Sequence, residues 1–326
     1  MPSETLIPRQ ETQYTQKSFE LVFHSFCSQY ATKICEATGE NTAHHVNNGS
    51  YLGLPQNATL RQMKDRLDEA IRVVGEPMDW ASDTFEASPT KEHVLLSARH
   101  LAWYATVGSL TQGYIDRLNG RIEQARADSG RNGSSGHNLD RLFSDRKEQV
   151  SLLIAQNSAI REYFESDLAR QLGNDSPVAM GALLSKAPFM DDLQRDALVS
   201  GISLEIATER YIEHLITTEG DERITLAHGD DSQDSRGGDF VLVCPDEIVY
   251  LDIKSTMPKK FTGRDNSTPQ DYERGYKWLA DDESGARKVV LWAYLEQPIQ
   301  RDGFNLVDSR LANNLKLVLD SLSLDY

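Results

Sequence analysis

Two carboxylates and a lysine in the C-terminal part of the chain have the types and the spacing that phosphodiester chemistry needs. Asp239 opens one short apolar run, and Asp252 and Lys254 close the next, with a Pro-Asp-Glu turn between the runs. Because side chains alternate between the two faces of a strand, Asp252 and Lys254 point the same way. If the runs fold into a hairpin, Asp239 meets this pair at one end of a sheet.

Such a set suits metal-assisted hydrolysis. Mg2+ binds carboxylate oxygens, waters and substrate phosphates, so we expect Asp239 and Asp252 to hold Mg2+, with Mn2+ as a substitute. Lys254 would then hold the attacking water or stabilise the developing charge. The alternative is a solvent-exposed pair of Asp252 and Lys254. The apolar surroundings in "IVYLDIKS" argue against it, because a buried unpaired carboxylate is costly.

This pattern resembles the PD-(D/E)xK nuclease superfamily, which includes many type II restriction endonucleases. The resemblance rests on Asp239, twelve intervening residues and the run Asp252-Ile253-Lys254, within a helix–strand–strand–strand–helix–strand order over about 192–296. Glycine instead of proline precedes the first aspartate, and the second acid is aspartate instead of glutamate. The resemblance implies a restriction-endonuclease-like α/β fold and a Mg2+-dependent endodeoxyribonuclease, in which the backbone carbonyl of Ile253 is a further metal ligand.

A helix expected over 198–218 carries two glutamates on its apolar stripe, Glu205 and Glu209. Carboxylates on a buried face need a partner or a metal. In the PD-(D/E)xK superfamily that this chain resembles, a glutamate on this helix often reaches the metal site. We favour Glu209, which precedes Arg210, over Glu205 as that residue. The alternative for either glutamate is a salt bridge to Arg210, Arg223 or Lys254.

Basic residues follow the motif. The segment 254–264 holds Lys259, Lys260 and Arg264 and no acid. Because it comes directly after the expected metal site, we expect these side chains to contact DNA phosphates, with a solvated loop as the alternative. Gln270, near the start of the next expected helix, is a further candidate, since some members of the superfamily place a glutamine there.

Composition limits the protein classes that fit. The 326 residues suffice for one large domain or two ordinary ones, and 39% are hydrophobic, which permits a real core. The net charge of −16 argues against a generally basic surface but allows a local basic cleft. Three cysteines without a Cys-x-x-Cys pair support neither a disulfide framework nor a zinc site. With no signal peptide and no apolar run of about 20 residues, we expect a cytoplasmic protein.

Helical patterns fill the first half of the chain. Helices are expected over 18–37, over 57–75 with Asn57 as cap, over 88–127 with a break near Gly108 or Gly113, and over 144–172. The Gly- and Ser-rich stretch 128–138 is expected to be a flexible loop.

The pattern changes near 175–190. A helix is expected over 192–218, followed by strands in "RITLAHG", "DFVLVC" and "EIVYLDIKS", a helix over 268–281, a strand over 288–295 and a last helix near 308–322. This order predicts a mixed sheet flanked by helices with an αβββαβ core. We therefore expect an α-helical region over 1–185 and a nuclease domain over 186–326.

These observations predict a metal-dependent DNA endonuclease, a type II restriction endonuclease, whose partner is double-stranded DNA. The helical region would supply target recognition, dimerisation or both, and cutting of a palindrome favours a homodimer. No Walker A loop is present, so neither ATP nor a membrane is expected as a partner. The alternatives are a repair or recombination nuclease, of the junction resolvase or exonuclease type, and a non-catalytic nuclease-like interaction protein.

Overall fold

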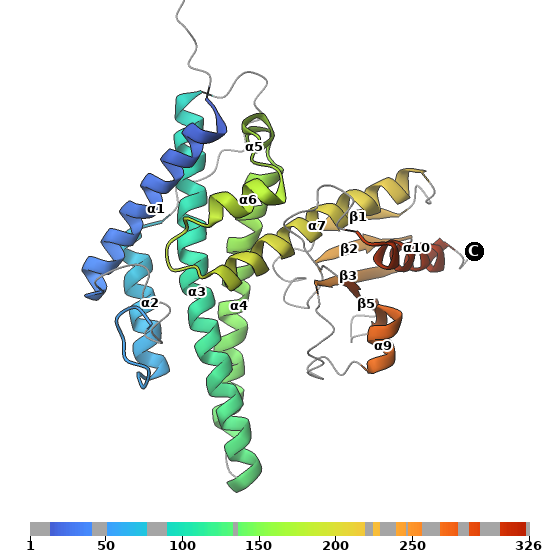
Figure 1. Ribbon diagram of the computed structural model, residues 1–326. Helices are drawn as coiled ribbons and strands as arrows, with labels where there is room; N and C mark the ends of the chain where they lie inside the picture. Colours follow the sequence, from blue (N-terminus) through green and yellow to red (C-terminus); the bar gives the residue numbers. More distant parts are fainter. Residues whose placement is uncertain are drawn as a thin grey trace, which may run out of the picture.

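The computed structural model describes residues 14–40, 51–76, 90–132, 136–218, 224–228, 239–245, 247–255, 268–279, 287–293 and 307–323. Helices make up the described residues before 219, and a five-stranded mixed sheet with flanking helices makes up those after 223 (Figure 1). The mixed α/β class expected from the sequence is confirmed. Among the described residues, no helix is both long enough and apolar enough to cross a membrane.

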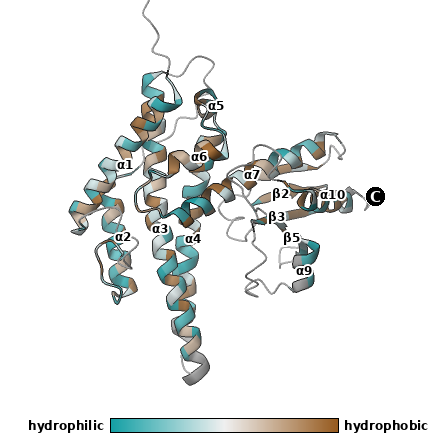
Figure 2. Cartoon of the chain, in the orientation of Figure 1, coloured by the Kyte–Doolittle hydropathy of each residue, from teal (hydrophilic) through white to brown (hydrophobic). Residues whose placement is uncertain are grey.

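The described residues of the N-terminal part contain the helices α1 Gln16–Thr38, α2 Leu60–Val74, α3 Lys91–Asn132, α4 Gly136–Glu165, α5 Asp167–Leu172 and α6 Pro177–Leu184. α6 is hydrophobic along most of its length, and most of its residues are buried in the helical core (Figure 2). The cap expected at Asn57 is wrong. α2 begins two residues later, because the Thr59 side chain accepts from the Gln62 backbone and Gln62 caps Thr59 in return.

α3 and α4 correct two sequence-based expectations. α3 is one continuous helix through Gly108 and Gly113, where a break was expected. At Gly113 an added Cβ would lie 3.2 Å from the Tyr51 ring, so this glycine serves close packing. The loop expected over 128–138 is largely helical, since α3 extends to Asn132 and α4 starts at Gly136. Packing of the two helices against each other outweighs the weak helix propensity of glycine and serine.

The expected helix over 144–172 is two helices. Ser166 ends α4 and caps α5, because its Oγ accepts from the Ala169 backbone N–H at 3.1 Å.

The sheet has the strands β1 Thr225–His228, β2 Phe240–Val243, β3 Ile248–Ser255, β4 Tyr276–Leu279 and β5 Arg287–Ala293, in the spatial order β1-β2-β3-β5-β4. β3 and β5 pair in parallel and the other neighbours antiparallel.

The helix expected over 268–281 is also wrong in its length. α9 covers only Pro269–Arg274, and Gly275, at φ +80°, ends it in the left-handed conformation. The next residues form β4 and pair with β5 at the sheet edge. Two side chains of α10 (Ser309–Ser323) bind the end of α9: Arg310 bonds the Glu273 carbonyl, and Asn314 donates to the Arg274 carbonyl at 3.0 Å.

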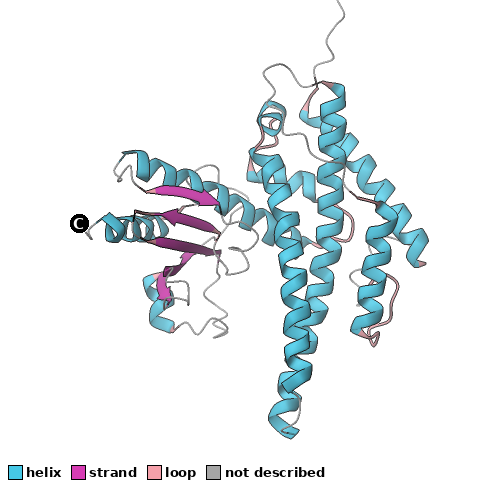
Figure 3. Ribbon diagram, turned by 180° about the vertical axis from the view of Figure 1, so that it is seen from behind, coloured by secondary structure: helices cyan, strands magenta, loops and turns pink. Residues whose placement is uncertain are grey.

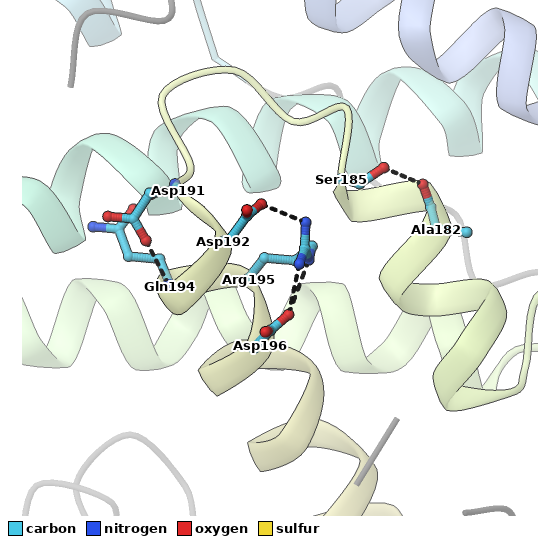
Figure 4. A network of polar contacts seen from close by, with 7 residues as sticks. All are labelled: Ala182, Ser185, Asp191, Asp192, Gln194, Arg195 and Asp196. Carbon is cyan, nitrogen blue, oxygen red and sulfur yellow. Dashed lines mark hydrogen bonds and ion pairs between the residues drawn. The ribbon is translucent and has the colours of Figure 1, made fainter. Parts of the chain in front are cut away.

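α7 (Asp192–Thr218) connects the helical part to the sheet (Figures 1 and 3). Its N-terminus is capped by Asp191, which exchanges hydrogen bonds with Gln194 (Figure 4). Val199 and Ile202 belong to the helical core, whereas the later apolar residues of α7 pack with α10 on one face of the sheet. One helix therefore contributes to both hydrophobic cores and carries both candidate glutamates.

Candidate active site

The hairpin of β2 and β3 brings the motif residues together. Phe240 pairs with Leu251, and the same register continued by one residue sets Asp239 opposite Asp252. The Asp239 carboxylate accepts a hydrogen bond from the Ile253 backbone N–H at 2.5 Å. This bond fixes Asp239 at the end of β3, as the sequence spacing predicts.

Asp252 lies on the sheet face opposite α7 and α10. Leu251 and Ile253 pack in the core below, so the alternation of the strand turns Asp252 and Lys254 to the other face. Asp252 is only 6% exposed, so it is not the solvent-exposed residue of the alternative interpretation. Its Oδ2 pairs with the Lys254 ammonium at 3.3 Å and with that of Lys288, on β5, at 3.2 Å.

The pKa of Asp239 is strongly raised. Burial raises its pKa well above the usual range, and the neighbouring charges of Glu205 and Asp252 raise it further. The Ile253 N–H and the Lys254 ammonium act in the opposite direction and are weaker. A carboxyl group in this setting would be ionised far more readily with a cation beside it.

The two glutamates of α7 meet one arginine of α4. Arg161 pairs with Glu209 through Nη2, with Glu205 through Nη1 at 3.5 Å and with Glu165 through Nε at 2.9 Å. The Glu209 side chain is 15% exposed and the Glu205 side chain 34%. Glu205 is also the neighbour whose charge acts most strongly on Asp239. The sequence favoured Glu209 over Glu205 for this position, and the electrostatics around Asp239 favour Glu205.

Arg161 also contacts the first strand of the hairpin. Its guanidinium carbon lies 5.7 Å from the ring centre of Phe240, the residue that follows Asp239. The side chain is only 10% exposed. A helix of the N-terminal part thus reaches both the glutamates and the strand that carries the first aspartate.

Sequence reasoning missed Arg161 and Lys288. Arg161 is separated from Glu205 and Glu209 by 44 and 48 residues, so no local spacing connects them. Its one sequence signal is a charge next to apolar Ile160, within the helix expected over 144–172. Lys288 reaches Asp252 because β5 pairs in parallel with β3, and Lys288 lies beside Tyr250 in that register.

The chemistry of these donors fits a hard divalent cation. Five carboxylates and three cations gather here, which leaves an excess of two negative charges when all are ionised: Glu165, Glu205, Glu209, Asp239 and Asp252 against Arg161, Lys254 and Lys288. Within the described ranges, no group of three or more histidine, cysteine, aspartate or glutamate side chains is arranged to hold a metal ion. Asp239, Asp252 and the Ile253 carbonyl offer oxygen donors of the kind that Mg2+ prefers, and Mg2+ takes few protein ligands and keeps several waters.

Of the four residues expected to contact DNA, the structure describes one. Lys259, Lys260 and Arg264 lie outside the described residues. Gln270 lies in α9 with an exposed side chain. Lys277, which the sequence put on the same helix, is in β4 and pairs in register with Val290, the neighbour of Asp252 on β5.

Comparisons with known proteins add no relative. No protein-family model matches the chain, and no curated protein and no solved structure is significantly similar to it.

Proposed function

We propose that this chain is a Mg2+-dependent DNA endonuclease of the PD-(D/E)xK superfamily, and that it works as a type II restriction endonuclease. The observation that carries the proposal is the partly buried Asp239 carboxylate, which accepts a hydrogen bond from the Ile253 backbone and lies opposite Asp252, the partner of Lys254. Two carboxylates that repel each other at one sheet end are costly unless a cation joins them. A divalent metal held by both carboxylates meets that need, and the same metal can bind the negatively charged phosphodiester.

Each residue has a distinct role in this proposal. Asp239, Asp252 and the Ile253 carbonyl hold the metal, which when bound neutralises phosphate charge and makes a water more acidic. Lys254, whose side chain is 40% exposed, donates a hydrogen bond to the attacking water or to a phosphate oxygen. Lys288 orients the Asp252 carboxylate through its 3.2 Å contact.

The remaining parts supply recognition. Lys259, Lys260, Arg264 and Gln270 contact DNA, and the helical region recognises the target, forms a homodimer on a two-fold symmetric site, or both. A junction resolvase or exonuclease with the same residues would prefer branched DNA or DNA ends. A non-catalytic interaction protein would cut none of these substrates.

The test is incubation of unmethylated phage DNA with the full chain. We expect discrete fragments with Mg2+ or Mn2+ and none in EDTA. Asp252→Asn and Lys254→Ala should each lower the cleavage rate by at least about 10²-fold, because even residues behind metal ligands are worth 10–100-fold. Asp192→Asn is the control, since Asp192 is exposed in the first turn of α7.

The pattern of products separates the candidate functions. Discrete fragments from linear and circular DNA indicate a restriction-type enzyme, whereas cutting confined to branched DNA or ends indicates a repair nuclease. Undiminished cleavage in EDTA would contradict the metal mechanism.

A further inference from the structure

We infer that Arg161 is a positioning residue for the metal site: it holds Glu205 in place beside Asp239, with Glu209 bound to the same guanidinium, and so makes the helical part a component of the catalytic unit. The inference rests on the proposed function and goes beyond it, because it gives α4 a role in the chemistry in addition to recognition or dimerisation.

The geometry uses each nitrogen of the guanidinium separately. Nε bonds Glu165 at 2.9 Å on the same helix, Nη1 lies 3.5 Å from Glu205, and Nη2 bonds Glu209. The planar fork of an arginine can satisfy several carboxylates at fixed angles, which a lysine cannot do. Glu165 therefore anchors the fork from α4, and the fork orients two carboxylates of α7.

The surroundings restrict the arginine further. Its side chain is 10% exposed, and it lies over the ring of Phe240, which is fully buried next to Asp239. The same side chain therefore links α4, α7 and β2. A change in the position of α4 would be transmitted to Glu205 and to the backbone that carries Asp239.

Removing Arg161 has two opposite effects on metal affinity. The direction of the net change shows whether Arg161 acts through its charge or as a positioning residue. As a positive charge near the site, the arginine repels a cation, so its removal would strengthen metal binding if charge were all that mattered. As a positioning residue it pre-organises Glu205, so its removal weakens metal binding. Arg161→Lys separates the two effects, because it keeps the charge and loses the fork.

The experiment measures Mn2+ affinity by electron paramagnetic resonance on the full chain, with thermal unfolding as a check of folding. We expect Arg161→Lys and Arg161→Gln to bind Mn2+ about 10- to 100-fold more weakly than the parent, as for residues that orient metal ligands. Arg195→Lys is the matched control. That arginine pairs with Asp192 and Asp196 in the first turns of α7 and is 21% exposed, so its variant should bind Mn2+ like the parent (Figure 4).

A second variant acts on Arg161 from the far side. Glu165→Gln removes the charge of the anchor on α4 and substitutes no group that faces Asp239. We expect its Mn2+ affinity to fall by several-fold while its unfolding temperature stays near that of the parent. This variant decides the matter if the substitutions of Arg161 do not fold.

The outcomes are separable from those of the cleavage test. Mn2+ affinity that is unchanged in Arg161→Lys and Glu165→Gln, or stronger in Arg161→Gln, overturns the inference, as does a parent protein that binds no Mn2+. A parent that binds Mn2+ and cuts no DNA refutes the endonuclease, while the affinities of the variants still decide whether Arg161 positions the site.

Discussion

Glu205 and Glu209 share Arg161 but differ in what else they face. Glu205 acts on Asp239, whereas Glu209 is more buried and is held by the arginine. We therefore expect Glu205→Gln to lower the single-turnover cleavage rate by about 10- to 100-fold, and Glu209→Gln to lower it less but to reduce the unfolding temperature more. Rate measurements at saturating DNA, with urea unfolding of both variants, check this. Equal activity of Glu205→Gln and the parent would remove Glu205 from the site.

Local periodicity determined which residues of the candidate site could be predicted from the sequence. Asp239, Asp252 and Lys254 could be grouped because a two-residue period and one short turn suffice to bring them together. Arg161 and Lys288 could not, since their contacts depend on helix packing and on a parallel strand pairing across long separations. For the same reason the choice of Glu209 over Glu205, one helical turn away, rested on the family resemblance alone.

At the scale of elements, the junction of α9 and β4 depends on Gly275. Gly275 has φ +80°, and an added Cβ would lie 2.6 Å from Arg310 Nε and 2.8 Å from Asn314 Nδ2. Gly275→Ala must therefore strain the backbone and displace two side chains that bind the end of α9. We expect this variant to lower the free energy of unfolding by about 1–3 kcal/mol more than the same substitution at a left-handed glycine with open space around it.

Gly173→Ala is the matched comparison. Gly173 has φ +72° at the end of α5, and nothing lies within 4 Å of its added Cβ. Urea unfolding of both variants isolates the crowding at Gly275 from the backbone strain that they share. Equal losses in the two variants would show that the contacts of α10 with α9 contribute little.

The elements themselves were predictable where apolar periodicity was long and uninterrupted. The helix over 192–218 and the three strands that follow it match α7, β1, β2 and β3 closely. Two errors concern glycines: a break was expected near Gly108 or Gly113, and none was expected at Gly275. In α3 the buried surface keeps Gly108 and Gly113 helical, and at Gly275 the helix does end, but the next residues pair with β5. Tertiary partners decided both cases, and a single sequence does not contain them.

For the whole molecule, the net charge of −16 sets a condition on DNA binding. An acidic protein repels the phosphate backbone at long range, so binding needs a concentrated basic surface. Lys259 and Lys260, directly after the motif, are the strongest candidates in the sequence. Changing both to glutamine should weaken DNA binding for all sequences alike and reduce the slope of log affinity against log salt by about two, because each phosphate contact contributes about 0.9.

The measurement is fluorescence anisotropy with labelled duplex DNA in Ca2+, over a range of salt concentrations. Lys33→Gln with Lys91→Gln is the control of equal charge, since both lysines are exposed on the helical part. Loss of charge alone would weaken binding in the two double variants equally, because long-range repulsion depends on the total. A larger loss of affinity and a larger decrease of the salt slope in the Lys259/Lys260 variant would identify local contacts. The slope reports the counterions that are released where a side chain contacts a phosphate. Matching slopes in the two variants would exclude these lysines from the DNA interface and move it to other basic residues of the chain.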